Sequence, residues 1–381
     1  MNILVLISHN WRGGRASGME VYTIELIRGL RAKGHSIFLA TGKAGAGYIP
    51  DPAAGVAVDL ELPFHSLSPL TNLQTYRRLR QVVIERRIDI VHAQHRTAAY
   101  FAHALWRKQG VPYVVTIHDP WHATPLKKLH GGLFLRWIAV SEFLRQLLIR
   151  QFNVPPERVR TIRNGADASR FAAVSSEQAA ALRAEYGIAP GEIILSQVSR
   201  LSRPKGHRDL IEALALLPRT LNYRCLIFGE GPELPRLKQL VRQRGLENKV
   251  LFCGFRSDIP VVFAATDVML LPSRSGEGLP LTVIEAMLSN VAVIAARTAG
   301  VPEIITDGQE GLLIDAGDIR ALASHIERLI TDADLRHRLA EAGRQIALKR
   351  FLLSRVIDET EAYYRLIIAH PQVEAGDNGA A

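Results

Sequence analysis

Hydrophobic residues follow two alternating patterns along the chain. Residues 3–7 form an unbroken apolar run, which is typical of a buried strand, and residues 20–33 repeat apolar positions at the spacing of one helix face. Residues 35–40 form a second apolar run directly after Gly34, a residue type that often ends helices. A strand, a helix and a strand in this order predict a βαβ unit, in which ligands bind at the carboxyl ends of parallel strands.

The same alternation continues through most of the chain. Further strands are predicted at residues 88–92, 113–117, 159–162, 193–198, 223–228, 250–255, 268–272 and 291–295, and helices at 97–108, 142–152, 207–217 and 234–244. After Gly308 the pattern is mainly helical up to about residue 369, and residues 370–381 are predicted to be a disordered tail.

A chain of 381 residues is longer than one ordinary hydrophobic core accommodates. The sequence therefore predicts an α/β protein with two doubly wound, Rossmann-like domains. We expect the first at residues 1–171, the second at residues 172–350, and a last helix at residues 351–369. The boundary is placed after Phe171, where a helical segment rich in Ala, Ser and Glu begins.

The composition, with 48% hydrophobic and 22% charged residues, is typical of a soluble globular protein. The first apolar run is too short to span a bilayer and follows no basic leader, so we expect a strand there and a cytoplasmic protein. Cys225 and Cys253 both lie in predicted strands. We expect them to be small core residues, because their spacing suggests neither a disulfide nor a metal site.

Positive charge is concentrated in the first half of the chain. Residues 1–171 carry 23 Lys and Arg against 11 Asp and Glu, a net charge of +12, whereas residues 172–381 carry 24 against 26, a net charge of −2. The basic half could face an anionic membrane surface or a phosphorylated glycolipid, and a solvated basic surface is an equally open alternative. Nucleic acid is disfavoured, because no binding motif accompanies the charge.

The segment with the clearest candidate chemistry is residues 273–287, Ser-Arg-Ser-Gly-Glu-Gly-Leu-Pro-Leu-Thr-Val-Ile-Glu-Ala-Met. It follows a predicted buried strand and enters a helix at Pro280, a residue type favoured at helix starts. Free N–H groups and the helix dipole make such a start an anion site. Glu277 lies just outside the helix and Glu285 inside it. A phosphate site beside carboxylates, which accept hydrogen bonds from sugar hydroxyls, suggests a nucleotide-sugar ligand.

Two glutamates separated by seven residues, in the setting E-G-L-P-L-T-V-I-E-A-M, resemble the signature of the family 4 retaining glycosyltransferases. The resemblance implies the GT-B fold, in which the final helix crosses back onto the first domain. It also implies that Glu277 contacts the donor sugar and that Glu285 binds the ribose hydroxyls. The neighbouring donor-binding positions implied by the resemblance are Gly278, Leu279 and Leu281.

Two cations, Arg200 and Lys205, lie on the predicted loop after the strand at residues 193–198. Cations at this place can neutralise a leaving diphosphate, on which negative charge develops as the glycosidic bond breaks. The segment Ser-Arg-Leu-Ser-Arg-Pro-Lys-Gly-His is similar to the pyrophosphate-binding segment of the family, with Arg200 and Lys205 at the matching positions. The role of Arg203 is left open.

In the first half, His118 ends the predicted strand of Val-Val-Thr-Ile-His-Asp-Pro, where open α/β sheets bind ligands. It resembles the family histidine near the donor sugar and the reaction centre. A role as general base is the weaker expectation, because the leaving phosphate can take the proton. Gly18 resembles the first-domain turn that approaches the donor phosphates, although Gly13 and Gly14 could supply that approach instead.

Two further turns resemble family turns near the donor base, and they contain Glu230 in one case and Phe255 with Arg256 in the other. The segment Asn164-Gly165-Ala166-Asp167 resembles the turn at the domain junction, for which Asn-Gly turn chemistry is a sufficient explanation. Asp332-Ala333-Asp334 has the form of a metal-binding D-x-D motif. Its place before a helix favours dipole compensation instead, so we expect neither a metal nor another cofactor.

Together with these residues, the resemblance implies a metal-independent hexosyltransferase that uses a UDP- or GDP-sugar, and retention of configuration is implied by the resemblance alone. The favoured acceptor is a glycolipid or polysaccharide of the cell envelope, as in lipopolysaccharide biosynthesis, with peripheral membrane contact through the basic domain as a hypothesis. Two alternatives stay open: a transferase of the same fold with phosphate or a small metabolite as acceptor, and a non-catalytic nucleotide-sugar-binding protein.

Overall fold

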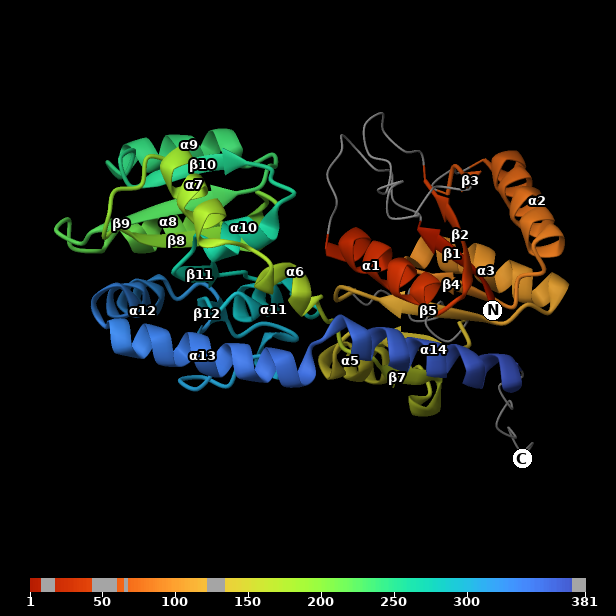
Figure 1. The fold of residues 1–381 in the computed structure, drawn as a ribbon. Coiled ribbons are helices and arrows are strands. Elements are labelled where there is room, and N and C mark those ends of the chain that lie inside the picture. Colours follow the sequence, from red (N-terminus) through yellow and green to blue (C-terminus); the bar gives the residue numbers. More distant parts are fainter. Residues whose placement is uncertain (8–17, 43–59, 65–67, 122–133, 372–381) are drawn as a thin grey trace. The chain divides into compact units, whose positions relative to one another are not determined.

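The computed structural model describes residues 1–7, 18–42, 60–64, 68–121 and 134–371. The chain divides into two compact units (Figure 1), of which the first consists of Met1–Arg163 together with Ser354–Ala381 and the second of Asn164–Leu353. The second unit therefore begins ahead of the expected boundary after Phe171. The expected disordered tail at residues 370–381 falls almost entirely outside the described residues.

In its described residues, the first unit has one parallel sheet of seven strands in the order β3-β2-β1-β4-β5-β6-β7. The order reverses between β1 and β4, which makes this the switch point where ligands bind in doubly wound sheets. The strands are β1 (Asn2–Ile7), β2 (Ser36–Thr41), β3 (Leu60–Glu61), β4 (Ile90–Ala93), β5 (Tyr113–Ile117), β6 (Trp137–Ala139) and β7 (Val159–Thr161). The helices are α1 (Gly18–Ala32), α2 (Pro69–Glu85), α3 (Arg96–Gln109), α5 (Glu142–Phe152) and α14 (Leu353–Ala369).

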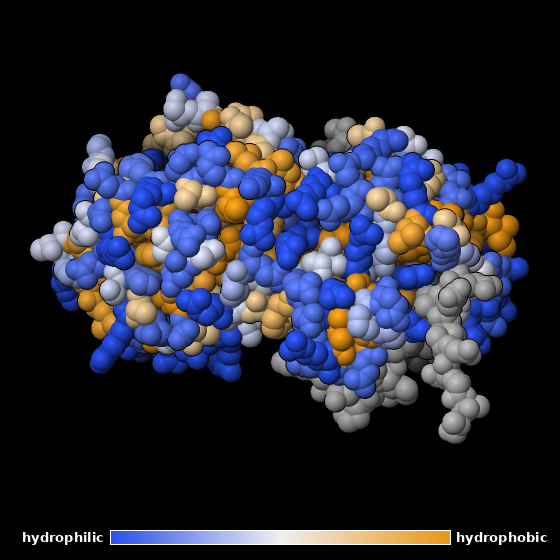
Figure 2. Space-filling model, turned by 90° about the horizontal axis from the view of Figure 1, so that it is seen from below, coloured by the Kyte–Doolittle hydropathy of each residue, from blue (hydrophilic) through white to orange (hydrophobic). Residues whose placement is uncertain are grey.

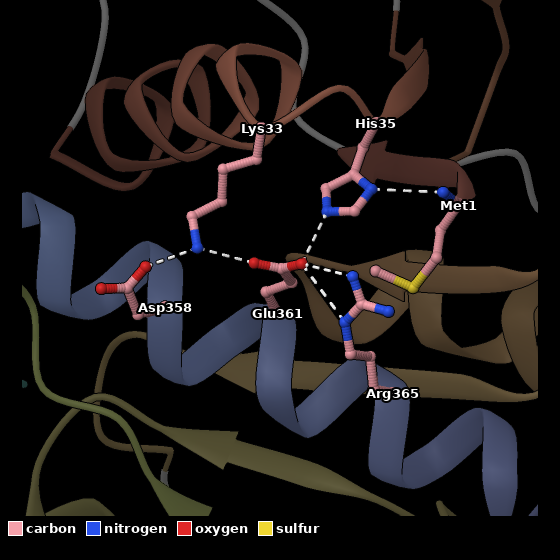
Figure 3. A network of polar contacts seen from close by, with 6 residues as sticks. All are labelled: Met1, Lys33, His35, Asp358, Glu361 and Arg365. Atoms are coloured by element: carbon pink, nitrogen blue, oxygen red, sulfur yellow. Dashed lines mark hydrogen bonds and ion pairs between the residues drawn. The ribbon is translucent and has the colours of Figure 1, made fainter.

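The last helix, α14, packs on α1, although the two are far apart in sequence. Gly29 of α1 allows this close approach, because a Cβ atom there would lie 1.9 Å from Cδ1 of Ile357. A group of polar residues adds to the contact (Figure 3), in which Glu361 accepts from Lys33 at 2.6 Å and lies 3.1 Å from Nε2 of His35. The other members of this group, which we call the α14 clasp, are Met1, Asp358 and Arg365.

The second unit has, in its described residues, a parallel sheet of six strands in the order β10-β9-β8-β11-β12-β13. Its switch point lies between β8 and β11. The strands are β8 (Ile193–Val198), β9 (Tyr223–Phe228), β10 (Val250–Gly254), β11 (Val268–Leu271), β12 (Ala292–Ala296) and β13 (Leu312–Ile314). The helices are α6 (Ala168–Ala172), α7 (Ser176–Glu185), α8 (His207–Ala215), α9 (Leu234–Gln243), α10 (Ile259–Ala264), α11 (Leu281–Leu288), α12 (Ile319–Thr331) and α13 (Ala333–Arg350).

The prediction of mainly helical structure after Gly308 is confirmed by α12, α13 and α14, but it did not include β13, which forms the edge of the second sheet. Its three residues are too few to show a strand pattern, and pairing with β12 decides their conformation. The predicted role of Asp332 is confirmed, because its carboxylate accepts from the N–H of Leu335 at 2.9 Å and caps α13. Cys225 is buried in β9 and Cys253 lies partly buried in β10, both as free thiols.

The surface view in Figure 2 shows mainly hydrophilic residues, with hydrophobic residues gathered in separate patches. Among the helices in the described part of the chain, none is both long and apolar enough to cross a membrane.

Candidate functional site

The central candidate residues of the second unit lie at the carboxyl ends of β8 and β11, on the two sides of its switch point. The loop after β8 carries Arg200 and Lys205, and the loop after β11 carries Glu277. Gly206 lets the two loops touch, because a Cβ atom there would lie 1.9 Å from the carbonyl oxygen of Pro272, and its φ of +70° also favours glycine. The fold thus brings together residues that are more than 70 positions apart.

An ion pair between Lys205 and Glu277 joins the two loops. The ammonium donates to Oε1 of Glu277 at 2.7 Å, and the Ser273 hydroxyl donates to the same oxygen at 2.6 Å. The Glu277 side chain is only 7% exposed, against 26% for Lys205. A buried carboxylate is costly without such donors. An anion that binds to Lys205 would therefore compete with Glu277 for the ammonium.

The loop after β11 is held in place by contacts that the sequence did not indicate. The Arg274 guanidinium donates to both carboxylate oxygens of Asp209 at 2.7 Å, and the Arg274 N–H donates to the carbonyl of Pro204 at 2.7 Å. Bidentate pairs of this kind fix geometry as well as charge. In addition, the Asn164 amide donates to the carbonyl of Leu279 at 2.8 Å. These residues position the loop that carries Glu277.

The helix α11 begins directly after this loop, with Pro280 at the position before its first residue. No side chain caps its amino end, so the N–H groups there are disposed towards an anion. Glu285 lies in the second turn of α11 and is buried. Of the other predicted donor positions, Gly278 and Leu279 are buried in the loop and Leu281 is partly exposed at the helix start.

Arg200 differs from the other cations of this site. It is exposed, and it has no ion-pair partner among the described residues. Arg203 lies 3.6 Å from Glu233 with its side chain 75% exposed, and it makes a loose surface pair. Arg200 is therefore the cation most readily available to a diphosphate.

The three residues predicted to lie near the donor base, Glu230, Phe255 and Arg256, differ from one another in their contacts and exposure. The backbone carbonyl of Glu230 accepts from the N–H of Leu201 at 2.9 Å, which ties its turn to the Arg200 loop. Phe255 is 39% exposed. The Arg256 guanidinium is already engaged by Glu185, Asp258 and the hydroxyl of Tyr186, and these acceptors raise its pKa further. Arg256 can thus meet a ligand through its backbone more readily than through its side chain.

The first unit supplies His118, which lies half-buried directly after β5. Its Nε2 lies 2.9 Å from Oε1 of Gln94, and the ring of Tyr22 meets it edge-on with centroids 5.1 Å apart. Burial lowers the pKa of His118 to about 3, and the positive field of His95 adds to this. At neutral pH the imidazole is uncharged. It is therefore suited to hydrogen bonding and poorly suited to taking up a proton.

Gly18, the other candidate of the first unit, is the first residue of α1 and lies one turn before Tyr22. A Cβ atom at Gly18 would meet no atom of the described residues within 4 Å, so packing against these residues does not require a glycine there. Gly13 and Gly14, the alternatives to it, lie outside the described residues.

The potential metal ligands and a further cavity of the second unit do not add to this site. The described residues contain no group of three His, Cys, Asp or Glu side chains placed to hold a metal ion. A cavity of about 930 Å³ lies between α8 and α9, where Arg203, Arg236 and Arg274 are paired with Glu233 and Asp209. The residues that line it include none of the predicted donor positions.

Comparison with protein-family models gives a match over each half of the chain. Residues 178–346 match the family described as Glycosyl transferases group 1, and residues 16–170 match Glycosyltransferase Family 4.

Three curated relatives are similar over much of their length. The α-D-kanosaminyltransferase of Streptomyces kanamyceticus is 30% identical over 77% of this chain and 81% of its own. The N-acetyl-α-D-glucosaminyl L-malate synthase of Bacillus anthracis is 26% identical over 78% and 79%. The lipopolysaccharide core biosynthesis glycosyltransferase LpsE of Rhizobium meliloti is 30% identical over 56% and 58%.

Among solved structures, the Anabaena protein HepE in complex with UDP and glucose is similar, with a TM-score of 0.83 and 25% identity over 96% of this chain and all of that one.

Proposed function

This chain belongs to the group 1, family 4 glycosyltransferases and is a transferase enzyme of GT-B fold, and from that premise we propose that it moves a hexosyl unit from a UDP- or GDP-sugar to a glycolipid or polysaccharide acceptor. We further propose that the transfer retains the anomeric configuration and needs no metal. The observation that carries the proposal is the ion pair of Lys205 with Glu277, which lies beside Arg200 and the uncapped start of α11.

The proposed chemistry follows from the charges at this place. The bond between the anomeric carbon and the diphosphate oxygen breaks, and its electron pair stays on the diphosphate. Arg200, Lys205 and the amino end of α11 stabilise this developing charge, which is the role that a metal ion has in other transferases. The acceptor hydroxyl bonds to the anomeric carbon, and its proton passes to the leaving phosphate. Because this proton needs no histidine, an uncharged His118 is compatible with the reaction.

The two glutamates have separate proposed roles. Glu285, on the second turn of α11, would accept hydrogen bonds from the ribose hydroxyls, and Glu277 would accept from a hydroxyl of the donor sugar. His118 and Gly18 are the first unit's proposed contacts with the substrates. The HepE complex with UDP and glucose supports a UDP-sugar as the donor.

The acceptor is proposed from charge and from the relatives. The basic first half suits an anionic acceptor, and the lipopolysaccharide enzyme LpsE supports a cell-envelope glycolipid. A small-metabolite acceptor is the second candidate, because the similar enzyme of Bacillus anthracis is named N-acetyl-α-D-glucosaminyl L-malate synthase.

Membrane contact is proposed through α2. Leu70, Leu73 and Ile84 are 73%, 44% and 53% exposed, and they lie on one helix face with the exposed Arg77 and Arg80. A helix that presents aliphatic side chains between arginines suits the surface of an anionic bilayer.

Calorimetric titration with UDP and with GDP, in EDTA, tests the donor site. We expect one nucleotide to bind, and we expect Arg200→Ala to weaken it about 10- to 100-fold, since a charge-assisted hydrogen bond is lost. Arg203→Ala is the matched control, because it removes a neighbouring exposed cation to which the proposal gives no role and which already pairs with Glu233. Binding of neither nucleotide to folded protein, or binding only after Mg²⁺ is added, would contradict the proposal.

The configuration of the product tests retention. With an α-linked donor, the anomeric proton of the new bond in a fresh NMR sample should show α geometry. A β product would make the enzyme inverting.

Sedimentation with phosphatidylglycerol vesicles and with phosphatidylcholine vesicles tests the membrane proposal. We expect binding to the anionic vesicles alone, lost in Arg77→Gln with Arg80→Gln and kept in Arg236→Gln with Arg242→Gln on α9. Equal sedimentation of all three proteins would remove the role of α2.

A further inference from the structure

A chain of buried polar side chains extends from His118 to the last helix of the protein. Oε1 of Gln94 lies 2.9 Å from Nε2 of His118, and the amide nitrogen of Gln94 lies 3.2 Å from both ring nitrogens of His92. Nδ1 of His92 is in turn hydrogen-bonded to the hydroxyl of Tyr364, and its Nε2 lies 2.7 Å from the hydroxyl of Thr116.

The members of this chain come from separate parts of the first unit. His92 lies in β4, which borders the sheet's switch point, and Gln94 is the first residue after this strand. Thr116 lies in the neighbouring strand β5. Tyr364 lies on α14, 272 residues after His92. His92, Gln94, Thr116 and Tyr364 are all at most 1% exposed, so the hydrogen bonds form without competition from water.

The hydrogen bond to Gln94 fixes the donor and acceptor roles of the two His118 ring nitrogens. Burial lowers the pKa of His92 to about 3, with a smaller contribution from His118, so both rings are uncharged at neutral pH. A neutral imidazole carries one proton on one of its two nitrogens, and the hydrogen bond that it makes selects which. Because the Gln94 amide oxygen can only accept, it selects the tautomer of His118 with the proton on Nε2. The other nitrogen, Nδ1, is then an acceptor.

We propose that Gln94, His92 and Tyr364 are positioning residues that hold the His118 ring in one orientation and one tautomer, so that Nδ1 is presented to a donating hydroxyl of the substrate. The last helix thereby takes part in organising the active site through its Tyr364 hydroxyl. This inference rests on the proposed function only in giving His118 a substrate contact. The tautomer itself is a property of the free protein.

The tautomer is measured first, by ¹⁵N NMR of protein labelled at histidine, with His118→Ala used to assign the His118 signals. We expect a protonated Nε2 and an unprotonated Nδ1 for His118 at pH 7 in the wild type. We expect Gln94→Met, which keeps the side-chain length and removes the acceptor, to give a mixture of tautomers. A protonated Nδ1 in the wild type, or an unchanged spectrum in Gln94→Met, would overturn the proposal.

Kinetics separate positioning from stability. We expect Gln94→Met to lower kcat about 10-fold or more with a smaller change in KM for the donor, as is common when a residue that orients a functional side chain is lost. Tyr364→Phe removes only one hydroxyl, at the end of the hydrogen-bond series that is farthest from His118, and should lower kcat a few-fold.

Tyr113→Phe is the matched control. It also removes a buried tyrosine hydroxyl, which lies 3.0 Å from Nδ1 of His103 and accepts from the N–H of Leu135 at 3.2 Å. Among the described residues, neither of these hydrogen bonds leads to His118. If Tyr113→Phe and Tyr364→Phe lower kcat equally at equal loss of Tm, the role of Tyr364 is structural and the inference is wrong. If the wild type transfers no sugar while its His118 has the expected tautomer, the proposed function fails and the hydrogen-bond chain stands.

Discussion

At the residue scale, the site depends on a few groups whose partners define their roles. Glu277 is the clearest case, since Lys205 and Ser273 both donate to the same carboxylate oxygen. Lys205 and Ser273 do not donate to the second carboxylate oxygen, Oε2. Under the proposed function, this is the oxygen that would accept from a hydroxyl of the donor sugar. The ion pair thus offsets part of the cost of burying this carboxylate.

Glu277→Gln should separate sugar recognition from nucleotide binding. Since UDP lacks the hexosyl unit that Glu277 is proposed to contact, we expect the Kd for UDP to change less than about 3-fold, or to fall as Lys205 is released. In contrast, kcat with the sugar donor should fall about 100-fold or more. Calorimetry and a transfer assay on one protein sample give both numbers. A parallel loss of UDP affinity would assign Glu277 to the nucleotide instead.

The structure requires a glycine at position 165 for a reason that differs from the predicted one. Its φ is not positive, so Asn-Gly turn chemistry does not explain it. A Cβ atom at Gly165 would lie 2.7 Å from the carbonyl oxygen of Leu352, and the neighbouring Ala166 exchanges backbone hydrogen bonds with Phe351 and Leu353. The two ends of the second unit meet here backbone to backbone.

Gly165→Ala should therefore lower the free energy of unfolding by about 1–3 kcal/mol, the usual cost of an overpacked site. Thermal unfolding measures this as a lower Tm. Gly18→Ala is the control, because a Cβ atom there meets no atom of the part of the chain that the structure describes, and its Tm should be that of the wild type. Equal Tm values for all three proteins would show that the backbone at Gly165 gives way easily.

At the element scale, α14 is held on the first unit by the α14 clasp as well as by packing (Figure 3). Hydrogen bonds from Lys33 and Arg365 lower the pKa of Glu361 to about 2 from an ordinary value of 4.5, with a smaller contribution from His35. A carboxyl whose pKa is lower in the folded state stabilises that state above its unfolded pKa and loses this effect as it is protonated. The contribution of Glu361 is thus complete above about pH 4.5 and disappears towards pH 2.

Glu361→Gln should lower Tm by about 2 °C at pH 7, the size expected for a surface ion-pair network worth about 1 kcal/mol. The difference from the wild type should shrink between pH 4.5 and pH 2. Glu359→Gln, which breaks the exposed Arg355 pair on the same helix, is the control and should have a smaller effect. A Tm difference that is constant over this pH range would exclude an ionic contribution of Glu361.

At the scale of the whole molecule, the first unit is built from two distant segments of the chain. Residues of α14 fill its core, with Tyr363, Tyr364 and Ile367 all at most 3% exposed. Without α14, the apolar face of α1 and the hydrogen-bonded side chains around His92 would both be exposed to water.

A chain that ends at residue 353 should consequently fail to fold its first unit, whereas a chain that ends at residue 371 should keep the Tm of the full protein. Limited proteolysis measures this, with rapid cleavage expected within residues 1–163 of the shorter chain. Equal protease resistance of the two chains would show that the first unit folds without its second segment.

The sequence was sufficient for the α/β class, most strands and the candidate donor residues of the second unit, because apolar runs and helix starts are local signals. It was not sufficient for β13, whose three residues show no pattern of their own, nor for the first unit's end at Arg163. The residues that position Glu277 and His118, such as Arg274 and Gln94, were also missed. Gln94 follows β4 directly at the switch point, a position that could have marked it.

The sequence by itself determined the order of strands and helices along the chain, because buried apolar side chains leave a local pattern. It also indicated the charged residues at the loops and the helix start that follow the strands, namely Arg200, Lys205, Glu277 and Glu285. Only the tertiary structure decided which of these residues meet. The Lys205–Glu277 pair, the Asn164 contact with Leu279 and the link from His118 to Tyr364 all join distant positions. Such contacts arise from the spatial order of the strands within each sheet and from helix packing, and no local pattern in the sequence encodes them.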